Sequence, residues 1–253
     1  AIYETLHREN QVLVCAQSNT AVDWIAEKLV DRGVPVLRIG KPSRVNDKML
    51  SFTYERRFEG HPAYTELWGI RKSIREMGNR MRKSSYSERE AARSRINHLR
   101  ERATELEIQI NEDLFSGARV IASTLVSSNH RILTGRRFTT LFIDEAAQAL
   151  EAACWIAIRK ADRVIFAGDH CQLPPTIKCI EAARNGLEQT LMEKVAANKQ
   201  ETVSLLKVQY RMHQSIMQFS SEWFYQGELQ AAPEVTNRGI LDLDLPMSWI
   251  DTS

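Results

Sequence analysis

Two adjacent carboxylates, Asp144 and Glu145, directly follow the apolar residues 141–143. Such an apolar run predicts the end of a buried strand, so both side chains are expected where the chain leaves a sheet. One carboxylate in this position can hold Mg²⁺, and the next can orient and deprotonate an attacking water, as phosphoryl transfer requires. A solvent-exposed acidic turn is the alternative interpretation, because apolar runs that end in Asp-Glu also arise by chance.

This chemistry also needs a phosphate-binding loop of the pattern G-x-x-x-x-G-K-[ST], whose backbone N–H groups surround the phosphate oxygens. The sequence contains no such loop. The nearest segment is Gly40-Lys41-Pro42, which has Pro35 in place of the first glycine and Pro42 in place of the hydroxyl residue. The two carboxylates therefore have no partner loop for phosphates within these 253 residues.

Two later segments carry residues that suit a terminal phosphate. In AGDHCQLPPT (167–176), Asp169 and Gln172 could contact that phosphate or its attacking water, although a proline-rich surface loop is the alternative. In the segment QYRMH, Arg211 could place a fixed positive charge on the transferring phosphoryl group. Tyr210, just before it, could stack on a flat base.

Small polar residues follow two other apolar runs: Ser18, Asn19 and Thr20 after the first, and Ser123 and Thr124 at the end of the second. A helix that begins at such a place presents free backbone N–H groups, which suit phosphate oxygens of a nucleotide or of a nucleic-acid backbone. A simple N-cap explains the same residues, and each segment taken alone favours the cap.

The elements that must position these side chains are predicted to be parallel strands. The strand candidates are residues 12–16, 36–40, 119–123, 140–144, 164–168 and 203–208. Most lack polar alternation, which is typical of parallel strands covered on both faces, and helices fit between them. The fold class is therefore α/β with a parallel sheet. In such a sheet, ligands bind at the carboxyl ends of the strands, where Asp144 and Gly168-Asp169 are expected.

Residues 53–116 interrupt this rhythm and predict an antiparallel helical hairpin inserted into the α/β domain. Apolar residues recur there at helical spacing, at 67, 70, 74, 77 and 81 and again at 96, 99, 103, 106 and 110. From Arg71 to Arg102 there are eleven Lys or Arg against four Glu, a local excess of +7. A solvated helical face explains this run slightly better than a nucleic-acid contact does.

The composition sets broader bounds. The net charge of +2 is too balanced to identify a partner, and the apolar runs are too short to cross a membrane. The four cysteines include no C-x-x-C pair, so neither a zinc site nor a disulfide framework is predicted. This usage fits a reducing intracellular compartment, either cytoplasmic or nuclear.

Five segments occur in one order: SNTAVD, ASTLVSS, LFIDEAAQ, GDHCQLPPT and QYRMH. As a set they resemble motifs Ia, Ic, II, III and IV of the superfamily 1 helicases, specifically the Upf-like branch. The resemblance covers nearly the whole chain. It implies a RecA-like P-loop NTPase domain, and it explains the hairpin as the helical insertion of this branch, called the stalk or subdomain 1C.

The resemblance also implies roles for individual residues. Asp144 would bind Mg²⁺, Glu145 would be the catalytic base, and Gln172 and Arg211 would contact the γ-phosphate of ATP. Asp169 and Tyr210 would lie near the nucleotide. The residues expected to contact the nucleic-acid strand are Ser18, Asn19, Thr20, Val22, Ser123 and Thr124.

The implied organisation is part of a first RecA-like domain (1–52), the helical insertion (53–116), the rest of that domain (117–245) and the start of a second RecA-like domain (246–253). We expect the phosphate loop to lie upstream, so that this chain is an inactive fragment of a monomeric, ATP-dependent DNA or RNA helicase. ATP and Mg²⁺ would be its cofactors, and single-stranded DNA or RNA, but no membrane, its partner. The alternative is a non-catalytic nucleic-acid-binding or scaffold module derived from a helicase.

Overall fold

The structure is a computed structural model that describes all residues except 82–85, 240–246, 248–249 and 251–253. It contains two compact units, residues 1–194 (unit 1) and residues 195–253 (unit 2). The division falls inside the stretch 117–245, which we expected to be continuous. The expected start of another domain at 246–253 lies mostly outside the described residues.

Unit 1 is built on a sheet of five parallel strands in the order β2-β3-β1-β4-β5. The strands are β1 (Val12–Ala16), β2 (Val36–Ile39), β3 (Val120–Thr124), β4 (Phe138–Asp144) and β5 (Ala161–Phe166). The α/β class with a parallel sheet is therefore confirmed, and five of the six strand predictions are correct to within a few residues.

The sixth strand prediction, residues 203–208, is wrong. Residues 203–207 form no strand in the structure. Only Val208–Gln209 (β6) pairs, with Gln230–Ala231 (β7), in a separate two-stranded sheet of unit 2. An apolar run shows that residues can be buried in a sheet, but it does not show which strand they will pair with.

Buried residues cover the sheet on both faces. On one face, alternate residues of β1, among them Val12 and Val14, form a core cluster with Leu6 and with Val22 and Ala26 of the helix that follows β1. The residues between them, such as Leu13 and Cys15, point to the other face and are also fully buried. The strands therefore have the continuous apolar runs seen in the sequence.

The helices are α1 (Ile2–Leu6), α2 (Asn19–Val30), α3 (Tyr54–Glu59), α4 (Tyr64–Met81), α5 (Tyr86–Ser116), α6 (Glu151–Ile158), α7 (Ile180–Ala182), α8 (Leu191–Asn198) and α9 (Gln214–Phe224). In the described part of the chain, no helix is both long enough and apolar enough to pass through a bilayer.

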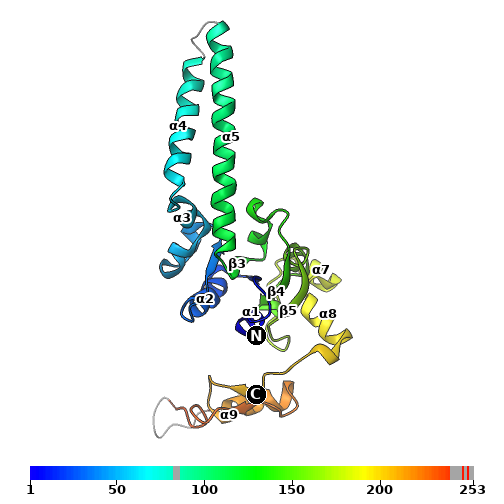
Figure 1. The fold of residues 1–253 in the computed structure, drawn as a ribbon. Helices are drawn as coiled ribbons and strands as arrows, with labels where there is room; N and C mark the ends of the chain where they lie inside the picture. Colours follow the sequence, from blue (N-terminus) through cyan, green and yellow to red (C-terminus); the bar gives the residue numbers. More distant parts are fainter. Residues whose placement is uncertain (82–85, 240–246, 248–249, 251–253) are drawn as a thin grey trace. The chain divides into compact units, whose positions relative to one another are not determined.

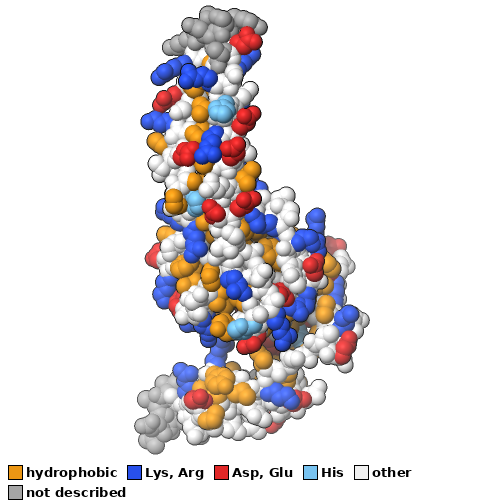
Figure 2. All heavy atoms as spheres, viewed as in Figure 1, with side chains coloured by type: hydrophobic (Ala, Val, Ile, Leu, Met, Phe, Trp, Pro, Cys, Tyr) orange, Lys and Arg blue, Asp and Glu red, His pale blue; other side chains and the backbone are white. Residues whose placement is uncertain are grey.

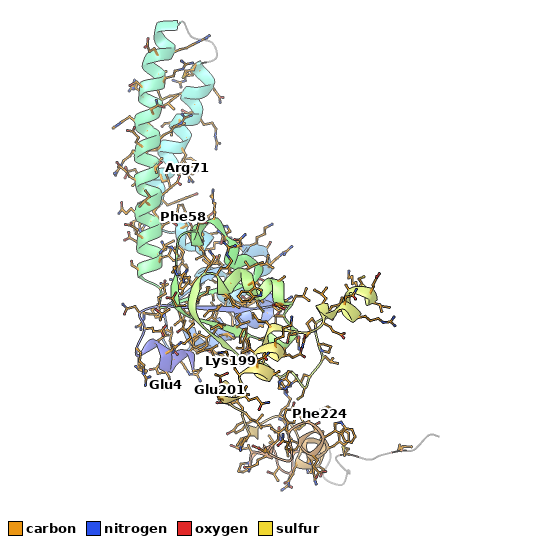
Figure 3. The ribbon with its side chains drawn as sticks, turned by 90° about the vertical axis from the view of Figure 1, so that its right-hand side faces the viewer. Glu4, Phe58, Arg71, Lys199, Glu201 and Phe224 are labelled. Carbon is orange, nitrogen blue, oxygen red and sulfur yellow. The ribbon has the colours of Figure 1, made fainter. Side chains whose placement is uncertain are left out.

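Helices α4 and α5 lie side by side and form the predicted hairpin (Figure 1). Their apolar seam is closed near its base by Leu67, Leu106 and Ile110, which are almost completely buried. Phe58 packs at this base, and Arg71 lies farther along α4 (Figure 3). The helical periodicity in the sequence therefore identified the correct buried face.

The outer surface of the hairpin carries mixed charges. Figure 2 shows basic and acidic side chains intermingled along it. Arg71 pairs with Glu107 at 2.6 Å, and Arg102 pairs with Glu66 at 3.0 Å and with Glu105 at 3.2 Å. Acidic residues outside the run from Arg71 to Arg102 thus pair with its first and last arginines.

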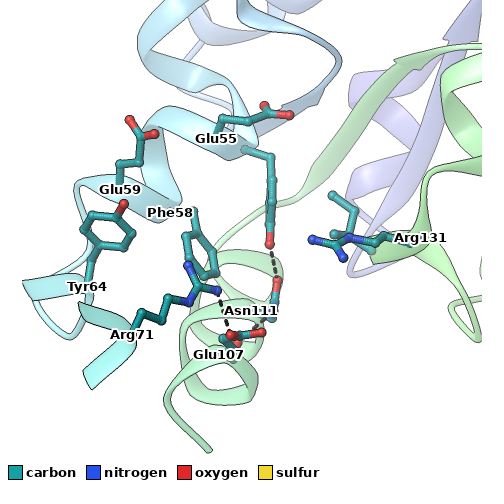
Figure 4. Close-up of a pocket in the computed structure, with 10 residues that line it drawn as sticks. Glu55, Phe58, Glu59, Tyr64, Arg71, Glu107, Asn111 and Arg131 are labelled. Atoms are coloured by element: carbon teal, nitrogen blue, oxygen red, sulfur yellow. Dashed lines mark hydrogen bonds and ion pairs between the residues drawn. The ribbon is translucent and has the colours of Figure 1, made fainter. Parts of the chain in front are cut away.

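A pocket lies at the base of the hairpin, lined by residues of α3, α4, α5 and the short turn Arg131–Leu133 (Figure 4). Inside it the Tyr54 hydroxyl donates to Asn111 Oδ1 at 2.8 Å, and Arg71 contacts Glu107. No candidate site residue from the strand ends lines this pocket. The pocket therefore lies where the hairpin meets the α/β core, apart from the residues predicted to bind and hydrolyse ATP.

Candidate active site at the carboxyl edge of the sheet

Strand register brings four loops to one edge of the sheet. The last residue of β1, Ala16, aligns with Thr124 at the end of β3 and with Asp144 at the end of β4. Ile143 of β4 aligns with Phe166, the last residue of β5. The loops that follow these strands are therefore neighbours, as a parallel sheet predicts.

Asp144 and Glu145 occupy different environments at this edge. Asp144 is half-buried, and burial raises the pKa of its carboxyl, while a hydrogen bond from the backbone of Glu145 partly offsets this effect. A carboxylate that has lost part of its hydration is stabilised by a nearby cation, so Asp144 fits the role of a Mg²⁺ ligand. The simple picture of an exposed acidic turn does not describe Asp144.

Glu145 is exposed and has an unusual backbone conformation. Its φ of 52° and ψ of 38° lie in the left-handed region, which few residues other than glycine adopt. The short helical turn Ala146–Gln148 begins directly after it. Such conformations cost on the order of 1–3 kcal/mol and persist where the surrounding structure fixes them. The backbone therefore turns sharply at Glu145, directly after the end of β4.

The loops after β4 and β5 are joined through their backbones. Ala167 donates to the carbonyl of Ile143 at 2.8 Å, and Ala146 donates to the carbonyl of Ala167 at 2.9 Å. Gly168 comes next, and a Cβ atom there would lie only 3.0 Å from the backbone nitrogens of Ala146 and Ala147. The lack of a side chain at Gly168 therefore allows the two loops to pack closely.

Asp169 organises the loop that carries Gln172. One carboxylate oxygen accepts from the Cys171 backbone N–H at 3.1 Å, and the other accepts from Gln172 Nε2 at 2.7 Å. The possible metal-ligand atoms of Asp169, His170 and Cys171 lie within 4.8 Å of one another, but these residues are consecutive and the Asp169 carboxylate already accepts two hydrogen bonds, so we assign no metal ion to them. Asp169 thus fixes the orientation of the exposed Gln172 side chain.

Tyr210 and Arg211 belong to unit 2, so the sheet of unit 1 does not position them. Their segment is held by Gln209, whose side-chain oxygen accepts from the backbone N–H groups of Arg211 and Met212, and whose amide donates to the Met212 carbonyl. Tyr210 is 67% exposed. Gln209 thus fixes the backbone of this turn, on which the side chains of Tyr210 and Arg211 are exposed.

The residues expected to contact nucleic acid separate into two groups. Ser18 caps α2 by accepting from the Ala21 N–H at 3.1 Å, as the N-cap interpretation predicts, and Thr20 beside it is exposed. Val22 and Ser123 are fully buried, so only their backbone could contact a bound strand, and the expectation that they do so stays a prediction. The helical period turns Val22 toward the sheet, and strand alternation turns Ser123 into the core.

Thr124 is also largely buried, and its hydroxyl bonds to Ser127 Oγ at 2.8 Å. Asn19, the first residue of α2, is partly exposed, and its side-chain oxygen accepts from Arg38 Nη2 at 2.9 Å. The residues at this end of the sheet that remain available to a strand are therefore few and small.

Sequence reasoning missed Arg38, Gln209 and the steric role of Gly168. A single arginine in the apolar strand VLRI was a usable signal, because a buried charge must have partners. Gln209 directly precedes Tyr210 and Arg211 in the sequence, but its hydrogen bond to the Arg211 backbone depends on the local turn.

Two family models, each described as an AAA domain, match residues 2–179 and 187–253. DNA-binding protein SMUBP-2 of Rattus norvegicus is 33% identical over 100% of this chain and 27% of its own length. DNA polymerase alpha-associated DNA helicase A of Schizosaccharomyces pombe is 32% identical over 96% of this chain and 36% of its own. A regulator of nonsense transcripts 1 homolog of Arabidopsis thaliana is 36% identical over 94% of this chain and 18% of its own.

The chain thus spans well under half the length of these relatives, while they match almost all of it. The matched stretches include the loops after β1, β3, β4 and β5. The chain belongs to the AAA domain family and is a domain of the superfamily 1, Upf-like helicase type.

Proposed function

We propose that this chain forms part of the ATP-hydrolysing motor of a nucleic-acid-stimulated ATPase and helicase that acts on single-stranded DNA or RNA. The observation that carries the proposal is the packing of the loop with Asp144 and Glu145 against the loop with Asp169 and Gln172. The names of relatives, which include a DNA helicase and a DNA-binding protein, agree with it.

Each residue has a role in this proposal. Asp144 holds Mg²⁺, which supplies charge neutralisation for the phosphates when it is bound. Glu145 accepts the proton of the attacking water, and Gln172 orients that water or the γ-phosphate. Arg211 stabilises the negative charge of the transferring group, and Tyr210 stacks near the adenine. Asp169 acts in nucleotide binding by holding Gln172 in place.

The strand-binding edge in this proposal contains Ser18, Asn19, Thr20 and Thr124, and the protein acts as a monomer in the cytoplasm or nucleus. Hydrolysis requires a phosphate-binding loop, and no such motif is present in residues 1–253. The relatives are longer than this chain, and we propose that the catalytic unit is a longer polypeptide that contains this chain together with such a loop.

The test is steady-state ATP turnover of that longer polypeptide with single-stranded DNA, with single-stranded RNA and with neither. The proposal predicts turnover that one of the two nucleic acids stimulates at least severalfold. Nucleic-acid binding without Mg·ATP binding or turnover would favour the alternative, a scaffold module derived from a helicase.

A further inference from the structure

A fully buried arginine, Arg38 of β2, holds the start of α2. Its Nε donates to Asp23 Oδ1 at 2.7 Å, its Nη2 to Asn19 Oδ1 at 2.9 Å, and its Nη1 to the carbonyl of Ile39 at 2.6 Å. A Cβ atom at Gly40 would lie 2.9 Å from Nη1. The chain thus leaves space for this guanidinium and pairs all three of its nitrogen atoms.

The bond to Asn19 does more than balance charge. Asp23 is itself buried and, among the described residues, is the acidic partner that supplies the negative charge a buried guanidinium needs. Its second oxygen accepts from the Asn46 backbone N–H at 2.9 Å, which anchors the carboxylate independently of Asn19. Asn19 is neutral, so the consequence of its bond to Arg38 is a fixed orientation of its amide.

That orientation determines what Asn19 offers to a ligand. Because Oδ1 is held by Arg38, the Nδ2 group points to the other side of the planar amide. Among the described residues, Asn19 Nδ2 donates no hydrogen bond, and the residue is partly exposed. Nδ2 carries two N–H donors and no acceptor, so it suits a phosphate oxygen of a nucleic-acid backbone.

We propose that Arg38 is a positioning residue for nucleic-acid binding: it holds Asn19 Oδ1 so that the Nδ2 donors face a backbone phosphate. This inference rests on the proposed function, in which the α2 start faces the strand. Arg38 is fully buried, so neither solvent nor the strand can reach it, and it acts through Asn19. Asn19 in turn contacts a backbone phosphate rather than a base.

The first test is Asn19→Asp, which exchanges one NH₂ group for an oxygen. The new carboxylate keeps an acceptor for Arg38, so the melting temperature should not fall. The outward group becomes an anion that repels phosphate, so affinity for a fluorescent single-stranded DNA or RNA oligonucleotide should fall at least about tenfold, as expected for losing a hydrogen bond to a charged group. Anisotropy of this 253-residue chain at low ionic strength measures it.

The second test is a double-mutant cycle with Arg38→Lys, since a lysine cannot bond both Asp23 and Asn19 in the same geometry. Arg38→Lys should weaken binding about threefold to tenfold in the wild-type background. In the Asn19→Ala background it should have no further effect, because its action passes through Asn19. An equal loss in both backgrounds would mean that Arg38 only stabilises the fold.

The outcomes separate this inference from the proposed function. If the wild-type chain does not bind either oligonucleotide at low ionic strength, the strand-binding face itself is wrong, and the inference fails with it. If the wild-type chain binds and Asn19→Asp binds equally well, only the role of Asn19 and Arg38 is refuted.

Discussion

Replacing Gly168 by alanine should disturb the alignment of the two loops that carry the proposed hydrolysis residues. The new Cβ would lie 3.0 Å from the backbone nitrogens of Ala146 and Ala147 and 3.1 Å from Met192 Sδ. The methionine side chain can move aside, but the two backbone atoms can move only with the loop that begins at Glu145. Ordinary contacts require a shift of a few tenths of an ångström.

Overpacking of this kind costs about 1–3 kcal/mol. In a domain of this size each kcal/mol lowers the melting temperature by roughly 2–4 °C. A 1 Å displacement of catalytic groups can cost about 100-fold in rate, so a smaller shift should reduce ATP turnover by about 10-fold or more. We expect Gly168→Ala to lower both quantities in the polypeptide that contains this chain and a phosphate loop.

The matched control is Gly69→Ala in helix α4, where an added Cβ would contact nothing within 4 Å. It should raise stability by about 0.5–1 kcal/mol, because alanine is the better helix former, and leave turnover unchanged. Melting temperature and nucleic-acid-stimulated ATP turnover are measured for both variants. Normal turnover and normal melting of Gly168→Ala would refute the argument that the two loops are packed into one site.

Three further predictions concern other residues of the proposed site. In the longer polypeptide, Arg211→Ala should slow ATP turnover by about 10³-fold while changing strand affinity less than about threefold. The control, Arg137→Ala at an exposed position, should change neither quantity. Lost strand binding with normal turnover would instead assign Arg211 to nucleic-acid binding. Because burial raises the pKa of Asp144, its protonated form stabilises the fold at acid pH, and this contribution is lost as the pH rises through the raised pKa. Asp144→Asn should therefore raise the melting temperature at neutral pH without Mg²⁺, with a difference that shrinks on acidification; a pH-independent difference or a lower melting temperature would contradict this. Residues 1–253 alone should neither bind Mg·ATP at micromolar concentration nor hydrolyse it, since no phosphate loop is present, and calorimetry followed by a phosphate-release assay would show the error if they do.

Much of the fold was predictable because burial leaves a direct mark on sequence. Strands covered on both faces appear in the sequence as apolar runs. The hairpin seam appears as apolar residues at helical spacing, among them the buried Leu67 and Ile110. Residues 203–208 show the limit of this signal, since an apolar run does not specify its pairing partner. The boundary between units at residue 194 also depends on packing that no local pattern records.

The sequence predicted which loops lie together at the candidate site, but not the environment of every side chain in them. Asp144, Glu145 and Gln172 could be placed because strand ends in a parallel sheet meet at one edge. The burial of Val22 and Ser123 was not predicted, because the motif strings that contain them include both exposed and core positions. Arg38 was missed because its contact with Asn19 joins residues from different elements, which only the folded chain brings together.

The most direct measurement of the central claim is made on Glu145→Gln in the polypeptide that contains this chain and its phosphate loop. The substitution keeps the size and a hydrogen-bonding oxygen but removes the basic carboxylate at the end of β4. Calorimetry with Mg·ATP and a steady-state turnover assay with single-stranded nucleic acid are performed on the same preparation. We predict unchanged affinity for Mg·ATP and a loss of turnover of about 10²-fold or more, the range of general-base catalysis. Turnover close to that of the wild type would contradict the assignment of this edge of the sheet as the hydrolysis site.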